Sequence, residues 1–231
     1  DRSEQIRKNG AGCAAAGEDG IEDSWNRVSN PTSIMKIIAI CGSGRSGSTL
    51  LSLLLSQDRS VFNLGQLRHL WRAFERDAAC TCERGLHACD IYGKVLSDSD
   101  DPARMQSLVK DFLKDAERQP DWTDDSTLRA LRERHREFLE RLGETLDRIA
   151  RHSGARDFVD TSKTPEIALA FELLPNADLY LLNLVRDPRA VACSWHKKDR
   201  SLVKTMKQSR DWKLRQQRLE SWEAALASRF M

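Results

Sequence analysis

The stretch GSGRSGST, from Gly42 to Thr49, has the residue types of an anion-binding loop. A Walker A loop reads Gly, four residues, Gly, Lys and then Ser or Thr, and Gly42, Gly47 and Thr49 fall in that register. Ser48 takes the place of the lysine that neutralises nucleoside triphosphates, which counts against ordinary NTP hydrolysis or kinase chemistry. Arg45 supplies a planar cation that suits a tetrahedral oxyanion. The plainer alternative is a glycine-rich turn that binds nothing.

A second basic motif follows the most apolar strand of the sequence. LVRDPRAVACS, residues 184–194, places Arg186 at the end of that strand and Ser194 on the helix that follows. The alternative for Arg186 is an ion pair with Asp187 or Asp160.

The elements that position these motifs alternate between strands and helices. Short β-branched or apolar runs predict strands at 35–41, at 60–65, in a segment ending near Asp160, and at 179–187. Helical spacing or capping signals predict helices starting at Ser48, over 66–77, 101–117, 126–151 and 165–173, and starting at Pro188 after an Asp187 cap. This order predicts a three-layer α/β/α fold with a central parallel sheet, in which ligands bind at the carboxyl ends of the strands. The loops at 42–49, 160–164 and 186–189 meet there.

Length and charge limit the class of protein. The 231 residues suit one domain, expected over 34–231 with a helical insertion at about 102–152, after a flexible or artificially added leader at 1–33. A net charge of +2 gives no global attraction to nucleic acid. The run IIAIC is too short for a membrane span or a signal peptide, so we expect a cytoplasmic protein. The oligomeric state is left open.

The two basic motifs together resemble a known family. Arg45-Ser46-Gly47-Ser48-Thr49 and Arg186 with Ser194 are similar to the motifs of P-loop-like sulfotransferases, including bacterial protein-tyrosine and carbohydrate enzymes, that use 3′-phosphoadenosine 5′-phosphosulfate (PAPS). The resemblance implies that the first loop holds the 5′-phosphosulfate and the second motif holds the 3′-phosphate. It therefore implies these cofactor-binding residues: Gly44, Arg45, Ser46, Gly47, Ser48, Thr49, Arg186 and Ser194. It also implies that no metal is required.

The resemblance further implies in-line transfer of the sulfuryl group to a hydroxyl of a small molecule, carbohydrate, lipid or tyrosine, with Arg45, Gln66 and Lys163 as catalytic positions. VDTSKTP, residues 159–165, resembles a segment whose lysine lies near the bridging oxygen, although Lys163 could also be a solvated strand-end residue. Gln66 stands where relatives have the presumed catalytic glutamate, and an amide cannot accept a proton at neutral pH.

Three explanations for Gln66 stay open. It could be an engineered substitution, the base could be His69 or Glu75 on the same predicted helix, or the chain could bind PAPS with little turnover. Two rival functions also stay open. One is a P-loop kinase or NTPase, with Asp160 as metal ligand, and the other is a catalytically silent nucleotide-binding module. Relatives also continue beyond a segment like RLESWEAALASRFM, so a C-terminal part of the fold is expected to be missing here.

Three further cysteines gather in one loop. Cys80, Cys82 and Cys89 follow the pattern C-x-C-x6-C, with His87 just before the last of them. Four ligands of these types could close a tetrahedral zinc site, but C-x-C is an uncommon spacing for zinc. On the sequence alone, reduced packing or a disulfide is favoured, and no metal ligand is assigned.

Overall fold

The computed structural model describes residues 34–97, 101–119 and 121–223, and the expected leader at 1–33 lies outside them. Along the described chain the elements are β1 (Met35–Gly42), α3 (Ser48–Leu55), β2 (Val61–Gly65), the 3-10 turn η2 (Leu67–His69), α4 (Leu70–Phe74), α5 (Tyr92–Ser97), α6 (Pro102–Arg118), α7 (Asp125–Arg134), α8 (Arg136–Ser153), β3 (Asp157–Lys163), α9 (Pro165–Glu172), β4 (Ala177–Leu184), α10 (Pro188–Asp199) and α11 (Leu202–Glu223). In these ranges no helix is both long enough and apolar enough to cross a bilayer.

The four strands form one parallel sheet in the order β2-β3-β1-β4. The apolar strand β1 lies inside the sheet, where a parallel strand is covered on both faces. Since all strands run in the same direction, their carboxyl ends share one edge. The predicted α/β class with a central parallel sheet is therefore confirmed.

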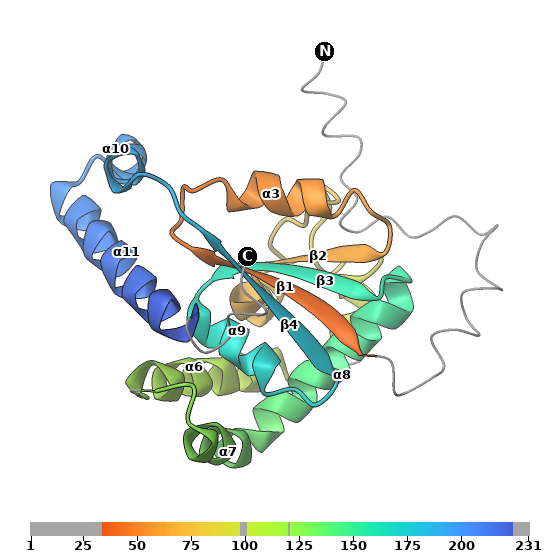
Figure 1. The fold of residues 1–231 in the computed structure, drawn as a ribbon. Coiled ribbons are helices and arrows are strands. Elements are labelled where there is room, and N and C mark those ends of the chain that lie inside the picture. Colours follow the sequence, from red (N-terminus) through yellow and green to blue (C-terminus); the bar gives the residue numbers. More distant parts are fainter. Residues whose placement is uncertain (1–33, 98–100, 120, 224–231) are drawn as a thin grey trace.

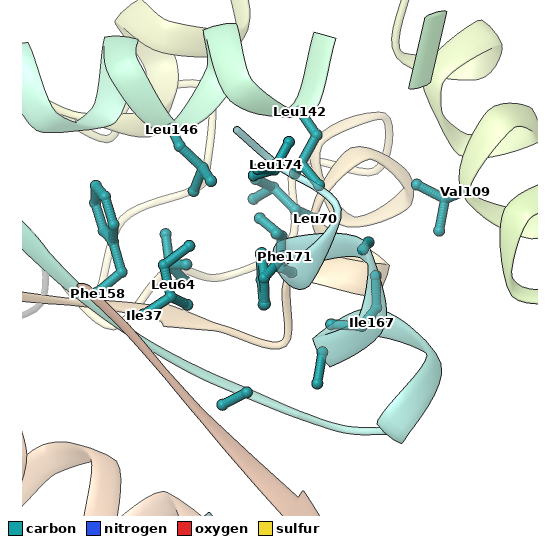
Figure 2. Packing of buried hydrophobic residues seen from close by; sticks show 14 of the residues in the cluster. Ile37, Leu64, Leu70, Val109, Leu142, Leu146, Phe158, Ile167, Phe171 and Leu174 are labelled. Carbon is teal, nitrogen blue, oxygen red and sulfur yellow. The ribbon is translucent and has the colours of Figure 1, made fainter. Parts of the chain in front are cut away.

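Helices cover both faces of this sheet. Figure 1 shows α3 on one side and α6, α8 and α9 on the other. On the second side, Leu142 and Leu146 of α8 face the sheet together with Phe171 of α9, and the strands contribute Ile37 and other apolar side chains (Figure 2). Burial of these side chains is the main source of stability for the fold.

Two helical predictions differ from the structure. The segment 126–151 is divided at His135, because this residue leaves helical geometry and its ring lies 3.1 Å (Nε2) from Oδ2 of Asp115 on α6. The segment 66–77 begins as the 3-10 turn η2 and continues only as the short helix α4. The short helix α5 was not predicted.

The strand ends also differ by a few residues. β3 does not end near Asp160 but continues to Lys163, which pairs with Cys41 after a register shift in β1. β4 ends at Leu184, so Arg186 lies beyond the strand in the turn toward α10. The predicted start of α10 is confirmed: Asp187 accepts a hydrogen bond from the N–H of Arg189 at 2.8 Å, and Pro188 is the first helical residue.

Candidate functional site

The loop between β1 and α3 has a backbone shaped around glycines and one strained arginine. Gly42 has φ 119°, and a Cβ there would lie 2.6 Å from the carbonyl oxygen of Leu184. Gly47 has φ 96° and precedes α3 without a side-chain cap, so the first-turn N–H groups of α3 are not taken by a capping side chain. Arg45 has φ 71°, a left-handed conformation that non-glycine residues seldom adopt. This arrangement leaves backbone donors for an anion at the positive end of a helix.

The two basic motifs meet through hydrogen bonds. Nε of Arg45 donates to Oγ of Ser194 at 2.9 Å, and Nη1 of Arg186 donates to the carbonyl oxygen of Arg45 at 2.7 Å. Within the described ranges, Asp187 forms its ion pair with Arg189, at 2.7 Å, and not with Arg186. Segments far apart in the sequence thus form one cationic patch at the carboxyl edge of the sheet.

Asp160 faces inward and organises the neighbouring strand ends. Its carboxylate accepts hydrogen bonds from the N–H of Leu67 at 3.0 Å and from the N–H and Oγ of Ser162, both at 2.8 Å. Burial raises the pKa of Asp160 to about 6, although these hydrogen bonds and Arg68 favour the ionised form. The side chain of Asp160 is buried, so its carboxylate is not exposed to bind a metal ion, as the kinase interpretation requires.

Lys163 lies at the end of β3 beside β1. It has φ 65°, so two strained non-glycine residues, Arg45 and Lys163, lie at the ends of adjacent strands. Its pKa is lowered by burial and then by the positive charge of Arg68. Strain of this kind is retained where the surroundings enforce it, and it concentrates at functional sites.

Two hydroxyl groups near these residues are buried and have no hydrogen-bond partner within the described ranges. They are Oγ of Ser46 in the β1–α3 loop and Oγ1 of Thr164, which follows Lys163. Buried polar atoms in native structures are usually paired, so both atoms point to a polar ligand or water at this edge.

Gln66 lies between β2 and η2 with an exposed side chain. The residues after it are fixed, because Leu67 donates to Asp160 and the N–H of Arg68 donates to Oγ of Ser162 at 3.2 Å. The pKa of His69 is lowered by partial desolvation and by the charges of Arg68, Arg72 and Lys163. His69 is therefore electrostatically coupled to Lys163, whereas Glu75 lies at the far end of α4.

Sequence reasoning missed one residue at this edge, Arg68. Arg68 is half-buried, its Nε has no hydrogen-bond partner in the described structure, and its pKa is lowered by burial and by Arg215. The available signal was its position just after β2, whose carboxyl end must lie at the same edge as the other strands. Trp195 of α10 packs against the loop, since a Cβ on Gly44 would lie 2.8 Å from its Cζ2. Gly44 is therefore needed for close packing of the loop against α10.

Comparison with protein-family models identifies the family of the chain. No curated protein and no solved structure is similar enough to match the chain. The model of the Sulfotransferase family matches residues 38–231, a range that holds the loop at 42–49, Lys163, Arg186 and Ser194. The matched range covers most of the chain and all four strands except the first residues of β1. A sulfotransferase transfers a sulfuryl group, and the cationic edge has the residue types for a sulfur or phosphorus oxyanion. The chain therefore belongs to the sulfotransferase family.

Proposed function

We propose that the chain transfers the sulfuryl group of PAPS to a hydroxyl acceptor. The observation that carries this proposal is the contact between the two basic motifs, with Arg45 bonded to Ser194 at 2.9 Å and to Arg186 at 2.7 Å. PAPS carries anionic groups on both sides of one ribose, the 5′-phosphosulfate and the 3′-phosphate. A donor of this kind needs two neighbouring anion sites, and ADP needs only one.

Each anionic group has a set of donors in the proposal. The 5′-phosphosulfate takes the backbone N–H groups at the start of α3, the Arg45 guanidinium and the unpaired hydroxyl of Ser46. The 3′-phosphate takes Arg186 and Ser194. Arg186 is exposed and uses one N–H for the carbonyl of Arg45, which leaves the rest of its five donors for phosphate.

The transfer step itself needs positioning and charge neutralisation. In an in-line transfer the acceptor oxygen forms a bond to sulfur while the bond from sulfur to the bridging oxygen breaks, and negative charge grows on the leaving phosphate. Lys163 lies at the end of β3 next to the loop that holds Arg45, so its ammonium is the proposed partner of that charge. Its pKa is lowered from the usual lysine value, chiefly by burial. Since burial disfavours the charged ammonium, an anionic partner stabilises that form.

The proton of the acceptor hydroxyl requires a base. Gln66 cannot take it, and we assign this role to His69, whose lowered pKa keeps the imidazole neutral at pH 7. Burial lowers this pKa most, and the charges of Arg68, Arg72 and Lys163 lower it further. On this assignment, kcat/KM falls as the pH drops through the His69 pKa, below the ordinary value of 6.5, and His69→Ala removes that limb.

The donor is tested by calorimetry with adenosine 3′,5′-bisphosphate (PAP) and with ADP plus magnesium. We expect PAP to bind at least about tenfold more tightly, since its 3′-phosphate gains charge-assisted hydrogen bonds. A preference for ADP would remove PAPS as the donor.

Turnover is tested separately with PAPS and a panel of hydroxyl acceptors. Gln66→Glu is expected to raise kcat, because it supplies a second proton acceptor at the position where similar sulfotransferases have a glutamate. PAP binding without turnover in either form would instead favour the catalytically silent nucleotide-binding module.

A further inference from the structure

Three thiols outside the proposed donor site converge in the loop between α4 and α5. The Sγ atoms of Cys80, Cys82 and Cys89 all lie within 4.8 Å of one another, and those of Cys80 and Cys89 are 3.7 Å apart. Within the described part of the chain, none of the three cysteines forms a disulfide. Cys89 is buried, and the other two are half-buried, so the group lies just below the surface.

These separations suit one shared metal ion. Zinc binds thiolate sulfur at about 2.3 Å in tetrahedral sites, which places two of its sulfur ligands about 3.8 Å apart. A disulfide would require sulfurs at about 2.05 Å, a much shorter separation. We propose that Cys80, Cys82 and Cys89 bind a zinc ion through three thiolates.

The backbone holds the first two cysteines in a tight turn. The N–H of Cys80 donates to the carbonyl of Arg84 at 2.8 Å, and the N–H of Glu83 donates back to the carbonyl of Cys80 at 3.0 Å. Glu83 has φ 66°, and Ala79 pairs with Gly85 in an isolated antiparallel bridge. This turn is already ordered by hydrogen bonds, so binding an ion costs little further ordering. The low ordering cost compensates for the uncommon C-x-C spacing.

Polar groups lie beside the sulfur atoms. The N–H of Tyr92 donates to Sγ of Cys89 at 3.4 Å. The guanidinium of Arg84, two residues after Cys82, pairs with the carboxylate of Asp90, the residue after Cys89. Three thiolates on a divalent ion leave one negative charge, and the N–H of Tyr92 points its positive dipole at this cluster.

His87 does not complete the set of ligands. Its Nε2 lies 2.7 Å from the carbonyl oxygen of Phe74, and its ring packs edge-on against Phe74 with centroids 4.4 Å apart. The fourth position is therefore left to water on the exposed side of Cys80 and Cys82.

The ion would brace the edge of the sheet. Tyr92, three residues after Cys89, donates its hydroxyl to the carbonyl of Leu64 in β2 at 3.1 Å, and its ring contacts Phe62 with centroids 5.8 Å apart. β2 leads directly into Gln66. The proposed ion thus stabilises the segment that packs against the carboxyl end of β2. This role does not depend on the identity of the sulfuryl donor.

Metal analysis of the whole chain, purified under reducing conditions without chelators, tests the site. We expect about one zinc ion per chain in the wild type and in the control Cys193→Ser, whose thiol lies on α10, and loss of zinc in Cys82→Ser. Absence of zinc from the wild type, or a Cys80–Cys89 disulfide in peptide mapping, would overturn the proposal.

A cobalt titration of the metal-free wild type keeps the test valid if Cys82→Ser does not fold. Three thiolate ligands predict intense sulfur-to-cobalt charge-transfer bands that saturate at about one equivalent and disappear when zinc is added. Cobalt spectra without charge-transfer bands would contradict thiolate ligation.

Discussion

The apolar layer beneath the sheet and the carboxyl edge of the sheet follow opposite rules. Between the sheet and helices α6, α8 and α9, the side chains of Phe112, Phe138 and Phe171 are fully buried against other apolar groups. At the carboxyl edge, Arg45 and Lys163 have positive φ, a conformation that costs non-glycine residues about 1–2 kcal/mol. Burial in the helical layer therefore stabilises the chain. The carboxyl edge instead holds strained residues and buried polar atoms without hydrogen-bond partners in the described structure.

The largest effect is expected in the helical layer. Phe112→Ala leaves a cavity between α6 and its neighbours and should lower the free energy of unfolding by about 3–5 kcal/mol. Denaturant unfolding measures this loss. At temperatures where the variant is folded, its affinity for PAP should equal that of the wild type. A comparable loss of PAP affinity in the folded variant would mean that the two regions are not separable.

Arg45 offers the matching change at the edge. Arg45→Ala should reduce kcat by about 10²–10³, because it removes a cation from the charge that develops during transfer. Arg45→Gly should lose the same activity but be more stable than the alanine variant by about 1 kcal/mol, since glycine accepts φ 71° without strain. The exposed residue Arg59, mutated to alanine, is the control. Equal stabilities of the two Arg45 variants would contradict the strain at this position.

Asp160 connects the two regions and should make stability depend on pH. Its pKa in the folded chain, about 6, is above the ordinary value of 3.8, so folding binds a proton between these values. The free energy of unfolding should therefore fall by up to about 2 kcal/mol as the pH rises from about 4 to about 6. Asp160→Asn should lack this component, so its stability relative to the wild type should increase through the same window. A pH-independent difference between the two proteins would show that folding leaves the pKa of Asp160 unchanged.

The smallest expected effect concerns Ser194. Its hydroxyl accepts the hydrogen bond from Nε of Arg45, and Ser194→Ala should weaken PAP binding by about 1 kcal/mol. Ser201→Ala provides a control outside the proposed site, in the turn before α11. Unchanged PAP affinity in Ser194→Ala would limit the 3′-phosphate contact to Arg186.

The sequence predicted the strands and the loop at 42–49 because their signals are local. An apolar β-branched run before Gly42, and the Asp187-Pro188 pair before α10, specify their elements within a few residues. The sequence also singled out Arg45, Arg186 and Ser194, which the structure joins by hydrogen bonds. Their roles toward PAPS remain proposals.

The features that were missed depend on contacts between distant segments. His135, where a continuous helical pattern is interrupted, contacts Asp115, twenty residues earlier on another helix. Asp160 is turned inward by donors on Leu67 and Ser162, and Arg68 reaches the edge only through the pairing of β2 with β3. Periodicity along one segment carries no information about such partners.

Calorimetry on wild type and Arg186→Ala, with PAP and with adenosine 5′-monophosphate, tests the central claim most directly. If Arg186 binds the 3′-phosphate, the variant should lose about 10- to 100-fold in affinity for PAP and almost none for the monophosphate, which lacks that group. An equal loss for both nucleotides, or no loss for PAP, would contradict a second anion site beside Arg45.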